Sequence, residues 1–335
     1  MQARNPGGRI FVPGEMTSYP GMEQHYGMLI AAGLMFTKLW PQPANPKPPA
    51  TVWKELEGAR WFEDGRLFVM RTGRAIHSFA WGLRVMGLTM PFAEDPIVSP
   101  INHSYIGLTV EPGPDISQPS RIGVGSAALV QALAADPVSI RTAIAGAESQ
   151  ALHLTASVVH RTLNQVFSFT ALPSGKSVYM ETYGGEGGPI QGGLVSILEE
   201  PGWVYGKAER RIVEGEPGWL NVDDRLGFAV HGGGGMRIRK DYRSRLLVLN
   251  DNPPRETVSI IVTLPAGAEE TRAFAARGFR AEVKHPDVAA VCVDGWMVAT
   301  NFSPHPTKAA ARCSGRAMQF SINGISTRVL AERTP

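Results

Sequence analysis

Apolar and polar residues alternate with a period of two along most of the chain after its first 50 residues. Residues 59–62 and 67–71 form two such runs on either side of Glu63-Asp64-Gly65, a sequence typical of a hairpin turn. A further run, residues 75–81, follows turn residues at Thr72-Gly73. Because period-two patterns indicate strands, this region is predicted to begin with an antiparallel meander.

Short runs of the same kind continue to the C-terminus, and turn-forming residues such as Pro173-Ser174-Gly175-Lys176 and Ser321-Ile322-Asn323-Gly324 lie between some of them. No repeat of about 20 to 50 residues is visible, which disfavours a propeller. A chain of many irregular strands is typical of an antiparallel sandwich or stacked-sheet fold. The predicted strands cover residues 104–110, 121–124, 149–160, 165–172, 177–182, 194–197, 210–213, 227–230, 236–238, 245–249, 257–264, 281–284, 289–293, 297–301 and 319–322.

A helical pattern dominates near the N-terminus instead. Thr17-Ser18-Tyr19-Pro20 predicts a capped helix start, and apolar residues then recur every three or four positions as far as residue 40. Two shorter helices are predicted over residues 124–133 and 269–277, the second with the better composition.

These patterns define the expected organisation of the chain. Residues 1–40 form a helical segment, the proline-rich residues 41–50 form an extended linker, and residues 51–335 form a β-sandwich domain. The expected fold class is therefore all-β, a large antiparallel stacked sandwich with a short N-terminal helical segment.

Composition supports this assignment and excludes several classes of protein. Of the 335 residues, 43% are hydrophobic and 19% charged, which is globular composition, while 37 Gly and 26 Pro favour short strands and turns. The 33 basic and 30 acidic residues are not gathered in long blocks, so we expect no nucleic-acid partner.

No membrane segment or leader is apparent. The longest apolar stretch, residues 28–40, is interrupted by Thr37 and Lys38 and is shorter than the ~20 residues that span a bilayer. Residues 1–13 lack the apolar run of a secretory signal. We expect a soluble chain without a membrane partner, and both a removed signal and a missing upstream region stay open.

The chain has two cysteines, Cys292 and Cys313, and neither belongs to a CxxC motif. Cysteine often behaves as a small buried hydrophobe. We therefore expect two buried free thiols, in preference to a disulfide between adjacent strands.

The sequence predicts no cofactor. Its eight His residues show no zinc-binding spacing. Asp223-Asp224-Arg225 is a dense polar cluster among strands, and it leaves two interpretations open: a structural calcium site, or a turn braced by an Asp–Arg ion pair. We favour the turn.

Two glycine-rich runs invite functional interpretations. His231-Gly232-Gly233-Gly234-Gly235 resembles an oxyanion-hole sequence, but Gly123-Val124-Gly125-Ser126-Ala127 is no nucleophile elbow, so a flexible hairpin loop is favoured. The run from Gly184 to Gly193 lacks the context of a phosphate loop, and we interpret it as a broad loop or the lip of a carbohydrate groove.

Three polar groups combine an acid or base with a cationic or amide partner, as proton abstraction next to a carboxylate requires. They are Asn102-His103-Ser104-Tyr105 at the start of a predicted strand, residues 160–164 (His-Arg-Thr-Leu-Asn) at the end of another, and Lys240-Asp241-Tyr242-Arg243 between two strands. Each is also ordinary surface composition.

The chain resembles the C-terminal half of the toroid-plus-sandwich polysaccharide lyases, the group of heparinase, alginate, hyaluronate and chondroitin lyases. Residues 18–20 (Ser-Tyr-Pro), with Gln24-His25-Tyr26-Gly27 and the following apolar helix, look like the last turn of a helical toroid. The likeness continues through the linker and into strands such as residues 66–71 and 75–82. The sequence segments 169–176 and 218–227 are also similar to those of the family.

The resemblance implies a supersandwich fold, an extracellular or periplasmic location and β-elimination on an acidic, uronic-acid polysaccharide. It also implies a missing helical toroid domain, because this sequence holds one toroid helix at most and the family draws most catalytic groups from that ring; a homo-oligomer is the other expected partner. The candidate catalytic residues are His103, Tyr105, His160, Arg161, Tyr242 and Arg243; the candidate substrate-binding residues are His25, Tyr26, Asn102, Asn164 and His231.

A non-catalytic β-sandwich that binds glycans or a protein partner is the alternative. Seven Trp and seven Tyr offer stacking surfaces for sugar rings. Two or more tryptophans exposed on one concave face would favour glycan binding, whereas wholly buried ones beside an apolar patch would favour a protein partner.

Overall fold

The computed structural model describes most of the chain from residue 51 onward. The expected N-terminal helix, the linker, and the predicted helix at 124–133 and strand at 121–124 lie outside the described residues. The structure describes residues 51, 54–62, 67–81, 85–91, 97, 105–109, 139–144, 151–160, 163–185, 191–197, 210–232, 236–240, 246–251 and 256–331.

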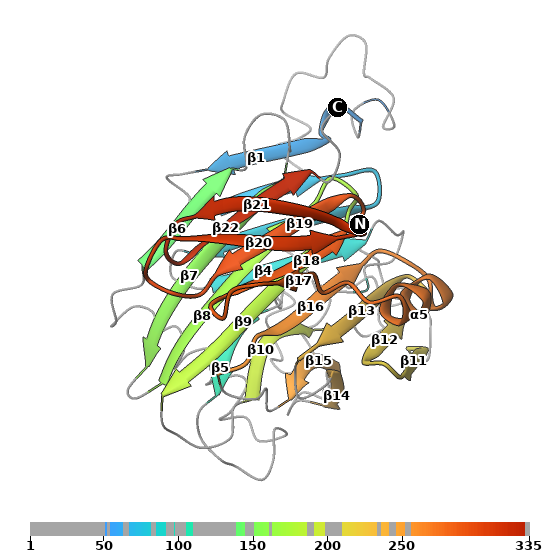
Figure 1. Ribbon diagram of the computed structural model, residues 1–335. Coiled ribbons are helices and arrows are strands. Elements are labelled where there is room, and N and C mark those ends of the chain that lie inside the picture. The colour runs from blue at the N-terminus through green and yellow to red at the C-terminus, as the bar shows by residue number, and fades with distance from the viewer. Residues whose placement is uncertain are drawn as a thin grey trace, which may run out of the picture.

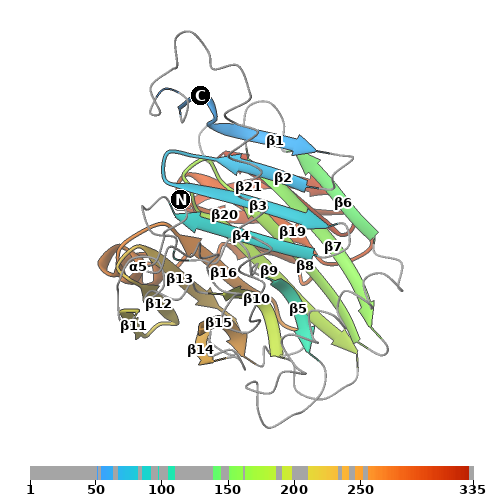
Figure 2. The same cartoon turned by 180° about the vertical axis from the view of Figure 1, so that it is seen from behind.

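The strands form four antiparallel sheets, which we name sheets I to IV. Sheet I has eight strands in the spatial order β1 (Gly58–Phe62), β2 (Leu67–Arg71), β3 (Ala75–Trp81), β4 (Val85–Pro91), β5 (Tyr105–Thr109), β10 (Gln191–Ile197), β15 (Leu246–Asp251) and β14 (Met236–Lys240). Figure 2 shows β1 to β4 as successive neighbours on one side of the molecule.

Sheet II also has eight strands. Their order is β11 (Ile212–Gly215), β12 (Trp219–Val222), β13 (Leu226–His231), β16 (Ser259–Leu264), β9 (Ser177–Gly185), β8 (Leu163–Ala171), β7 (Leu152–His160) and β6 (Ser139–Ile144). Every residue of β16 is buried, as expected for a strand that is covered on both faces.

Two small sheets complete the structure. Sheet III contains β18 (Val288–Val293), β19 (Trp296–Asn301) and β22 (Ser326–Ala331), and sheet IV contains β17 (Glu282–Val283), β20 (Thr307–Cys313) and β21 (Arg316–Ile322). Helix α5 (Ala268–Ala276) connects sheet II to this region. None of the described helical segments is long and apolar enough to cross a membrane.

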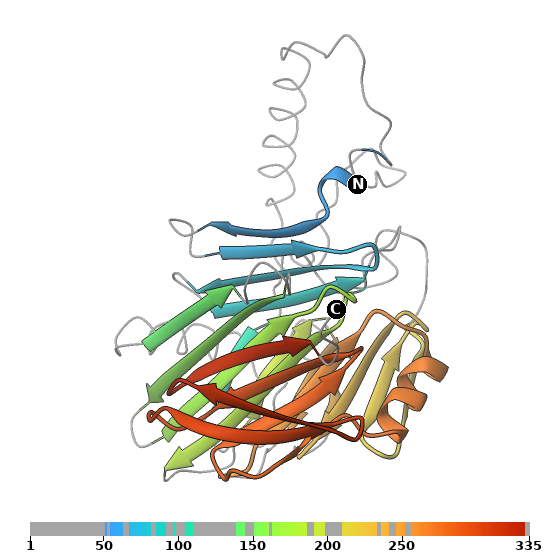
Figure 3. The ribbon, with the colours of Figure 1, turned by 45° about the horizontal axis from the view of Figure 1, so that its top comes forward.

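Three hydrophobic cores stack the sheets in layers, and the alternation of side chains along each strand explains how. In β9, Tyr179 packs in the first core with Phe79 of sheet I, whereas Val178 and Met180 pack in the second core with Val298 of sheet III. Figures 1 and 3 show the resulting layers, with strands β1 to β4 of sheet I in blue and sheets III and IV in orange and red.

The third core lies between sheets III and IV, and alanine dominates it. In β18, Ala289 and Val291 face the second core while Val288 and Ala290 face the third, so sheet III is buried on both sides. Small side chains let two short sheets pack closely, and the exposed residues of sheet IV then form an outer surface of the protein.

A polar seam also joins sheets II and III. Thr155 of β7 shares a hydrogen bond of 2.8 Å with Thr327 of β22, and Ser168 of β8 shares one of 2.8 Å with Thr300 of β19. The hydroxyls of Thr300 and Thr327 are themselves 2.9 Å apart. Because all four hydroxyls find partners, this buried seam fixes the lateral position of the two sheets without leaving unsatisfied groups.

The structure confirms the predicted β class. The hairpins at residues 59–71 and 165–182, the turn at Thr72-Gly73 and helix 269–277 all form where the sequence predicts them. The main additions are strands that the sequence pattern did not show: β4, β6, β12, β20 and β22.

Three predictions about connections are wrong. Cys292 and Cys313 form a disulfide, and they lie on facing sheets III and IV rather than on adjacent strands. Their Cα atoms are 5.7 Å apart, a separation that a disulfide spans readily. The glycine run after His231 is not a hairpin loop, because β13 belongs to sheet II and β14 to sheet I. Gly192 and Gly193 belong to β10 rather than to a loop.

The cluster at Asp223-Asp224 forms a braced turn. Asp223 pairs with Arg210, not with the adjacent Arg225, and also accepts a hydrogen bond of 2.8 Å from the backbone of Arg211. Asp224 accepts one of 2.6 Å from the N–H of Ala268, which caps helix α5. Both carboxylates are thus occupied by protein donors, and the described residues contain no group of three potential metal ligands.

Candidate functional site

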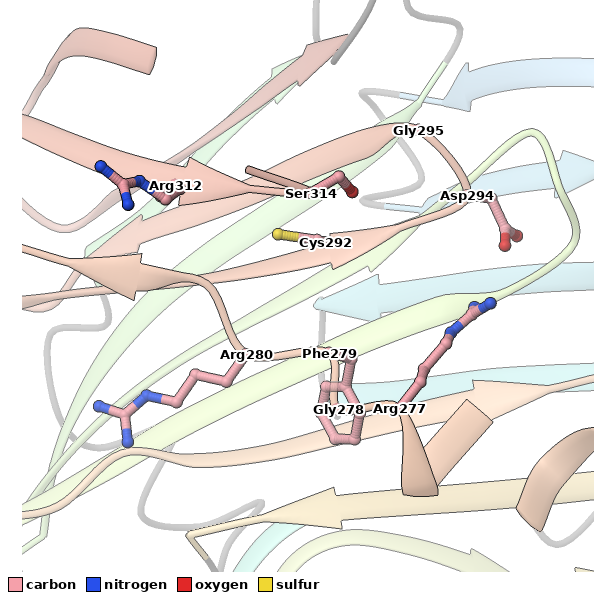
Figure 4. Close-up of a pocket in the computed structure, with 9 residues that line it drawn as sticks. All are labelled: Arg277, Gly278, Phe279, Arg280, Cys292, Asp294, Gly295, Arg312 and Ser314. Atoms are coloured by element: carbon pink, nitrogen blue, oxygen red, sulfur yellow. The ribbon is translucent and has the colours of Figure 1, made fainter. Parts of the chain in front are cut away.

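A pocket of about 470 Å³ opens where the end of α5 meets the tips of sheets III and IV. Arg277, Arg280 and Arg312 line it, and we call it the arginine pocket. Figure 4 shows that Arg280 and Arg312 extend at one end, while Arg277 points toward Asp294 at the other. Its wall also includes Cys292 of the disulfide.

The end of α5 places Arg277. Gly278 follows it at φ +72°, a left-handed conformation that glycine adopts readily, and donates a hydrogen bond of 3.1 Å to Ala275. The guanidinium carbon of Arg277 lies 4.9 Å from the centre of the Phe274 ring. This cation–π contact holds the side chain at the pocket while its polar edge stays available.

Arg280 is held by the edge of β18. The flanking residues Phe279 and Ala281 exchange backbone hydrogen bonds with Cys292 and Ala290, so the segment lies along the strand. Phe279 is buried and stacks on Phe274, which turns the neighbouring Arg280 outward. The resulting position is rigid, although the residue itself is exposed.

His231 at the end of β13 contacts this segment. Its Nε2 lies 3.0 Å from a guanidinium nitrogen of Arg280, and its ring meets Phe279 edge-on. Burial, and then the positive charge of Arg280, lower the pKa of His231 below its ordinary value. Because arginine can only donate, the neutral imidazole accepts this hydrogen bond. His231 is the one predicted site residue that the structure places against the pocket lining within the described part of the chain.

Two tight turns close the other side of the pocket. Asp294-Gly295 joins β18 to β19 and Ser314-Gly315 joins β20 to β21, and all four residues have positive φ. Two-residue turns of this kind match the twist of paired strands. They bring Ser314, and with it Arg312, close to the β18 edge.

The arginine pocket is electropositive. Asp294 is the sole acidic residue in its described lining, and Lys176 lies 2.8 Å from both of its carboxylate oxygens. Among the described residues, no carboxylate forms an ion pair with the three lining arginines. Guanidinium groups bind carboxylate and sulfate through paired hydrogen bonds, so the pocket has the chemistry of an anion site.

A second polar cluster lies deep in the first core. The hydroxyls of Tyr179 and Tyr183 donate to one oxygen of Glu181 at 2.7 and 2.6 Å, and the Gln165 amide donates to the same oxygen at 3.3 Å. Burial, and then the charge of Glu181, raise the pKa of both tyrosines well above the ordinary value. All four side chains are buried, so this cluster is placed to stabilise the fold and not to reach a substrate.

Two buried histidines likewise do not belong to the described lining of the arginine pocket. His77 contacts Thr89 at 3.0 Å, and Thr89 contacts Ser177 at 2.6 Å. Burial lowers the pKa of His77 to about 3 and that of His153 to about 4. Both rings are therefore neutral at physiological pH.

The predicted catalytic residues are only partly located. Tyr105 lies in β5 of sheet I, whereas His160 in β7 and Asn164 in β8 lie in sheet II, on neighbouring strands. The other candidates, His25, Tyr26, Asn102, His103, Arg161, Tyr242 and Arg243, lie outside the described residues.

Sequence reasoning missed the arginine pocket. Its three arginines are separated by up to 35 positions and each stands alone in the sequence. The charge of one region could have indicated it. Residues 277–331 contain seven Arg and Lys against three Asp and Glu, so their net positive charge is larger than the net charge of +3 of the whole chain.

No protein-family model matches the sequence, and no curated protein matches it. Among solved structures, the chain is similar to the chondroitin AC lyase of Streptomyces coelicolor A3, with a TM-score of 0.48 and 15% identity over 85% of this chain and 44% of that chain. A second structure of that lyase was solved in complex with chondroitin sulphate.

Other solved structures show lower scores. The heparan sulfate lyase HepC of Pedobacter heparinus matches with a TM-score of 0.41 and 10% identity over 83% of this chain and 44% of that chain. An α-galactosidase of Geobacillus stearothermophilus matches with a TM-score of 0.34 and 10% identity over 62% and 41% of the two chains. The chain thus spans less than half the length of these solved proteins.

Proposed function

We propose that this protein binds an anionic polysaccharide and cleaves it by β-elimination, as polysaccharide lyases do. The observation that carries the proposal is the arginine pocket, in which Arg277, Arg280 and Arg312 present guanidinium groups that form no ion pair with any carboxylate in the described part of the chain. Uronate carboxylates and sulfate esters are the anionic groups of such polymers, and guanidinium binds both in a bidentate manner. The sequence resemblance to toroid-plus-sandwich lyases and the layered antiparallel sheets support the same class.

The chemistry would use groups that the sequence predicts. A base, His103 or His160, removes the proton on the carbon beside the uronate carboxylate, which Arg161 or Arg243 neutralises. The electron pair forms a carbon–carbon double bond as the glycosidic bond breaks, and Tyr105 or Tyr242 returns a proton to the leaving oxygen. His25, Tyr26, Asn102 and Asn164 would contact the bound sugars. The predicted helical-ring partner or second copy of the chain belongs to this proposal.

The location of the protein follows from its chemistry. Disulfides persist mainly in oxidising compartments, and Cys292–Cys313 is such a bond. We therefore place the protein outside the cytosol, in the extracellular space or the periplasm, where its polymer substrate would also be.

Ultraviolet absorbance of the unsaturated product tests the reaction directly. The full chain would be incubated with chondroitin sulphate, heparan sulfate, hyaluronate and alginate, and absorbance followed with time. We expect absorbance to rise with at least one polymer and the rise to be much slower for the Arg280→Gln/Arg312→Gln variant. Arg272→Gln, an exposed arginine of α5 outside the pocket lining, is the matched control. A folded protein that releases no unsaturated product from any polymer would overturn the enzymatic proposal.

A non-catalytic glycan-binding module is the second candidate. It is favoured by the composition of the arginine pocket, whose described lining holds anion-binding groups but no Tyr, Glu or His. The described tryptophans give this candidate no support from sugar stacking, because Trp219 is only 7% exposed and Trp296 is half-buried against the second core. Binding of a polymer without unsaturated product identifies this function.

A further inference from the structure

A second basic hollow lies on sheet IV, apart from the arginine pocket. It has a volume of about 700 Å³, and Lys284, Lys308 and Arg328 supply its charge. We call it the lysine hollow. Its described lining contains no Asp or Glu, and Gln319 and Ser321 provide neutral hydrogen-bonding groups.

The alternation of β20 creates this surface. Ala309, Ala311 and Cys313 point into the third core, so the residues between them face outward. These include Lys308 and Arg312, both exposed. The core positions are small or disulfide-bonded, so the strand is fixed from beneath and its cations are presented on a rigid support.

The end of β17 and strand β22 of sheet III add the remaining charges of the hollow. Lys284 follows β17, and its N–H donates to the carbonyl of Ala310, so it lies beside the middle of β20. Arg328 of β22 donates from its guanidinium to the Ser321 carbonyl at 2.8 Å. That single hydrogen bond positions the guanidinium and leaves its other N–H groups for a ligand.

Strand β20 connects the two basic sites. Arg312 lines the arginine pocket and Lys308 lines the lysine hollow. They are four residues apart on one face of an extended strand, which corresponds to ~13 Å. Glu282, opposite Arg312 in the β17–β20 pair, is the one acidic residue that the register places on this face in the described part of the sheet.

We propose that the lysine hollow is a second binding site for sulfate or carboxylate groups of the same polymer, so that one anionic chain lies along β20 and occupies both sites. This inference rests on the proposed function, and it extends it by assigning a ligand class: a linear polysaccharide with anionic groups on successive sugars. The hollow recognises the spacing of charges along a chain. A single sugar or a disaccharide is shorter than this separation and engages one site only, and the gain for a long chain is an effective-concentration effect.

The test compares polymer with oligosaccharide on the full chain. Binding of chondroitin sulphate polymer and of a chondroitin sulphate disaccharide would be measured by titration calorimetry for wild type and for the Lys308→Glu/Arg328→Glu variant. We expect the variant to lose polymer affinity on the order of tenfold, the scale of two exposed charge contacts. Its disaccharide affinity should stay within about twofold of wild type, because the arginine pocket is intact.

Two controls separate the sources of an effect. Lys54→Glu reverses the charge of one exposed residue next to sheet I, which is the outer layer opposite sheet IV. This variant should leave both affinities unchanged. The Arg280→Gln/Arg312→Gln variant should bind both the polymer and the short saccharide more weakly than wild type. Unfolding temperatures of all variants confirm that each is folded.

The failures are distinguishable. Equal polymer affinity of wild type and the Lys308→Glu/Arg328→Glu variant would overturn the two-site inference, whether or not the protein is an enzyme. Polymer binding that drops with this variant, but with no unsaturated product from wild type, would support the second site and contradict β-elimination. Absence of polymer binding by folded wild type would overturn both.

Discussion

The ammonium group of Lys176 lies 2.8 Å from each carboxylate oxygen of Asp294 and joins the β8–β9 turn of sheet II to the β18–β19 turn of sheet III. The lysine side chain is 7% exposed and the aspartate side chain 26% exposed. Lys176 therefore neutralises the acidic residue of the arginine pocket from within the protein. This pair decides how positive the pocket is.

Replacing the lysine tests that role. Lys176→Met leaves Asp294 without its cation, so we expect stability to fall by about 1–3 kcal/mol. We also expect anion affinity at the pocket to drop about two- to fivefold, because the free carboxylate repels the ligand across the arginines. Urea unfolding and titration with the chondroitin sulphate disaccharide measure the two effects. Lys176→Met/Asp294→Asn should recover the lost affinity; failure to recover it would show that the effect is not electrostatic.

The disulfide should contribute strongly to stability. Cys292 and Cys313 are 21 positions apart, and closing a loop of that length in the unfolded chain corresponds to ~3 kcal/mol. We expect Cys292→Ser/Cys313→Ser to lower the free energy of unfolding by about this amount, measured with urea. Reductant should destabilise wild type to the same extent and leave the double variant unchanged. A reductant effect on the double variant would point to a different cause.

Burial of His77 makes stability depend on pH. Its pKa is about 3 in the folded protein and 6.5 when unfolded, so between these values the unfolded chain binds the extra proton. Stability is thus fully present above pH 6.5 and falls as pH decreases toward 3, by up to about 4–5 kcal/mol from this group. His77→Gln should flatten the profile over this range, measured by urea unfolding at a series of pH values.

Another histidine supplies the control for that profile. His305 is exposed, so His305→Gln should retain the acid sensitivity of wild type. His153, with a pKa of about 4, accounts for part of the acid sensitivity that His77→Gln retains. An unchanged profile in His77→Gln would contradict the assignment.

The Tyr179–Glu181–Tyr183 cluster should behave as a unit. Tyr183→Phe removes one donor to a buried carboxylate, and we expect a loss of about 1–3 kcal/mol, with a similar loss for Tyr179→Phe. Each single variant leaves Glu181 one of its two tyrosine donors, whereas the double variant removes both. The double variant should therefore cost more than the sum of the two, which a double-mutant cycle from urea unfolding detects. Strict additivity would mean that the hydroxyls act independently.

Close packing of α5 on sheet II provides a further test. A Cβ atom on Gly227 would lie 2.1 Å from the Thr271 hydroxyl oxygen, closer than any real contact. Gly227→Ala should therefore destabilise by about 2 kcal/mol or more through overpacking. Gly184→Ala in β9, where a Cβ meets nothing within 4 Å, is the matched control and should have little effect in thermal unfolding. Equal stability of the two variants would show that α5 shifts freely.

Local chemistry was sufficient to predict much of the fold. The hairpin at Glu63-Asp64-Gly65, the turn at Pro173-Ser174-Gly175-Lys176 and helix α5 depend on neighbouring residues, so short sequence windows identify them. Strand β12 was not predicted: its Trp-Leu-Asn-Val sequence is short, contains a polar asparagine and directly precedes the turn at Asp223-Asp224. Its asparagine, Asn221, is in fact buried and donates to Ala266 and Thr271.

The candidate site depends on long-range packing, which sequence patterns do not show. Cys292 and Cys313 meet because two sheets face each other, and a pattern of strands does not say which sheets stack. Arg277 and Arg312 line one pocket for a similar reason, because the end of α5 and the tip of sheet IV are brought together by packing. The burial of Glu181 is also hidden from sequence patterns: acidic residues are usually exposed, yet two tyrosines at alternate positions on the same strand donate hydrogen bonds to this carboxylate and make its burial favourable.

The bond between Cys292 and Cys313 also sets the geometry of recognition. It ties β18, along whose edge Arg280 lies, to β20, which carries Arg312 directly before Cys313. The entropy of arranging these charges is therefore lost when the protein folds, before any ligand arrives. A polymer whose anionic groups have the same spacing as these cations gains affinity at little further cost in entropy. A polymer with a different spacing has to change its conformation in order to bind.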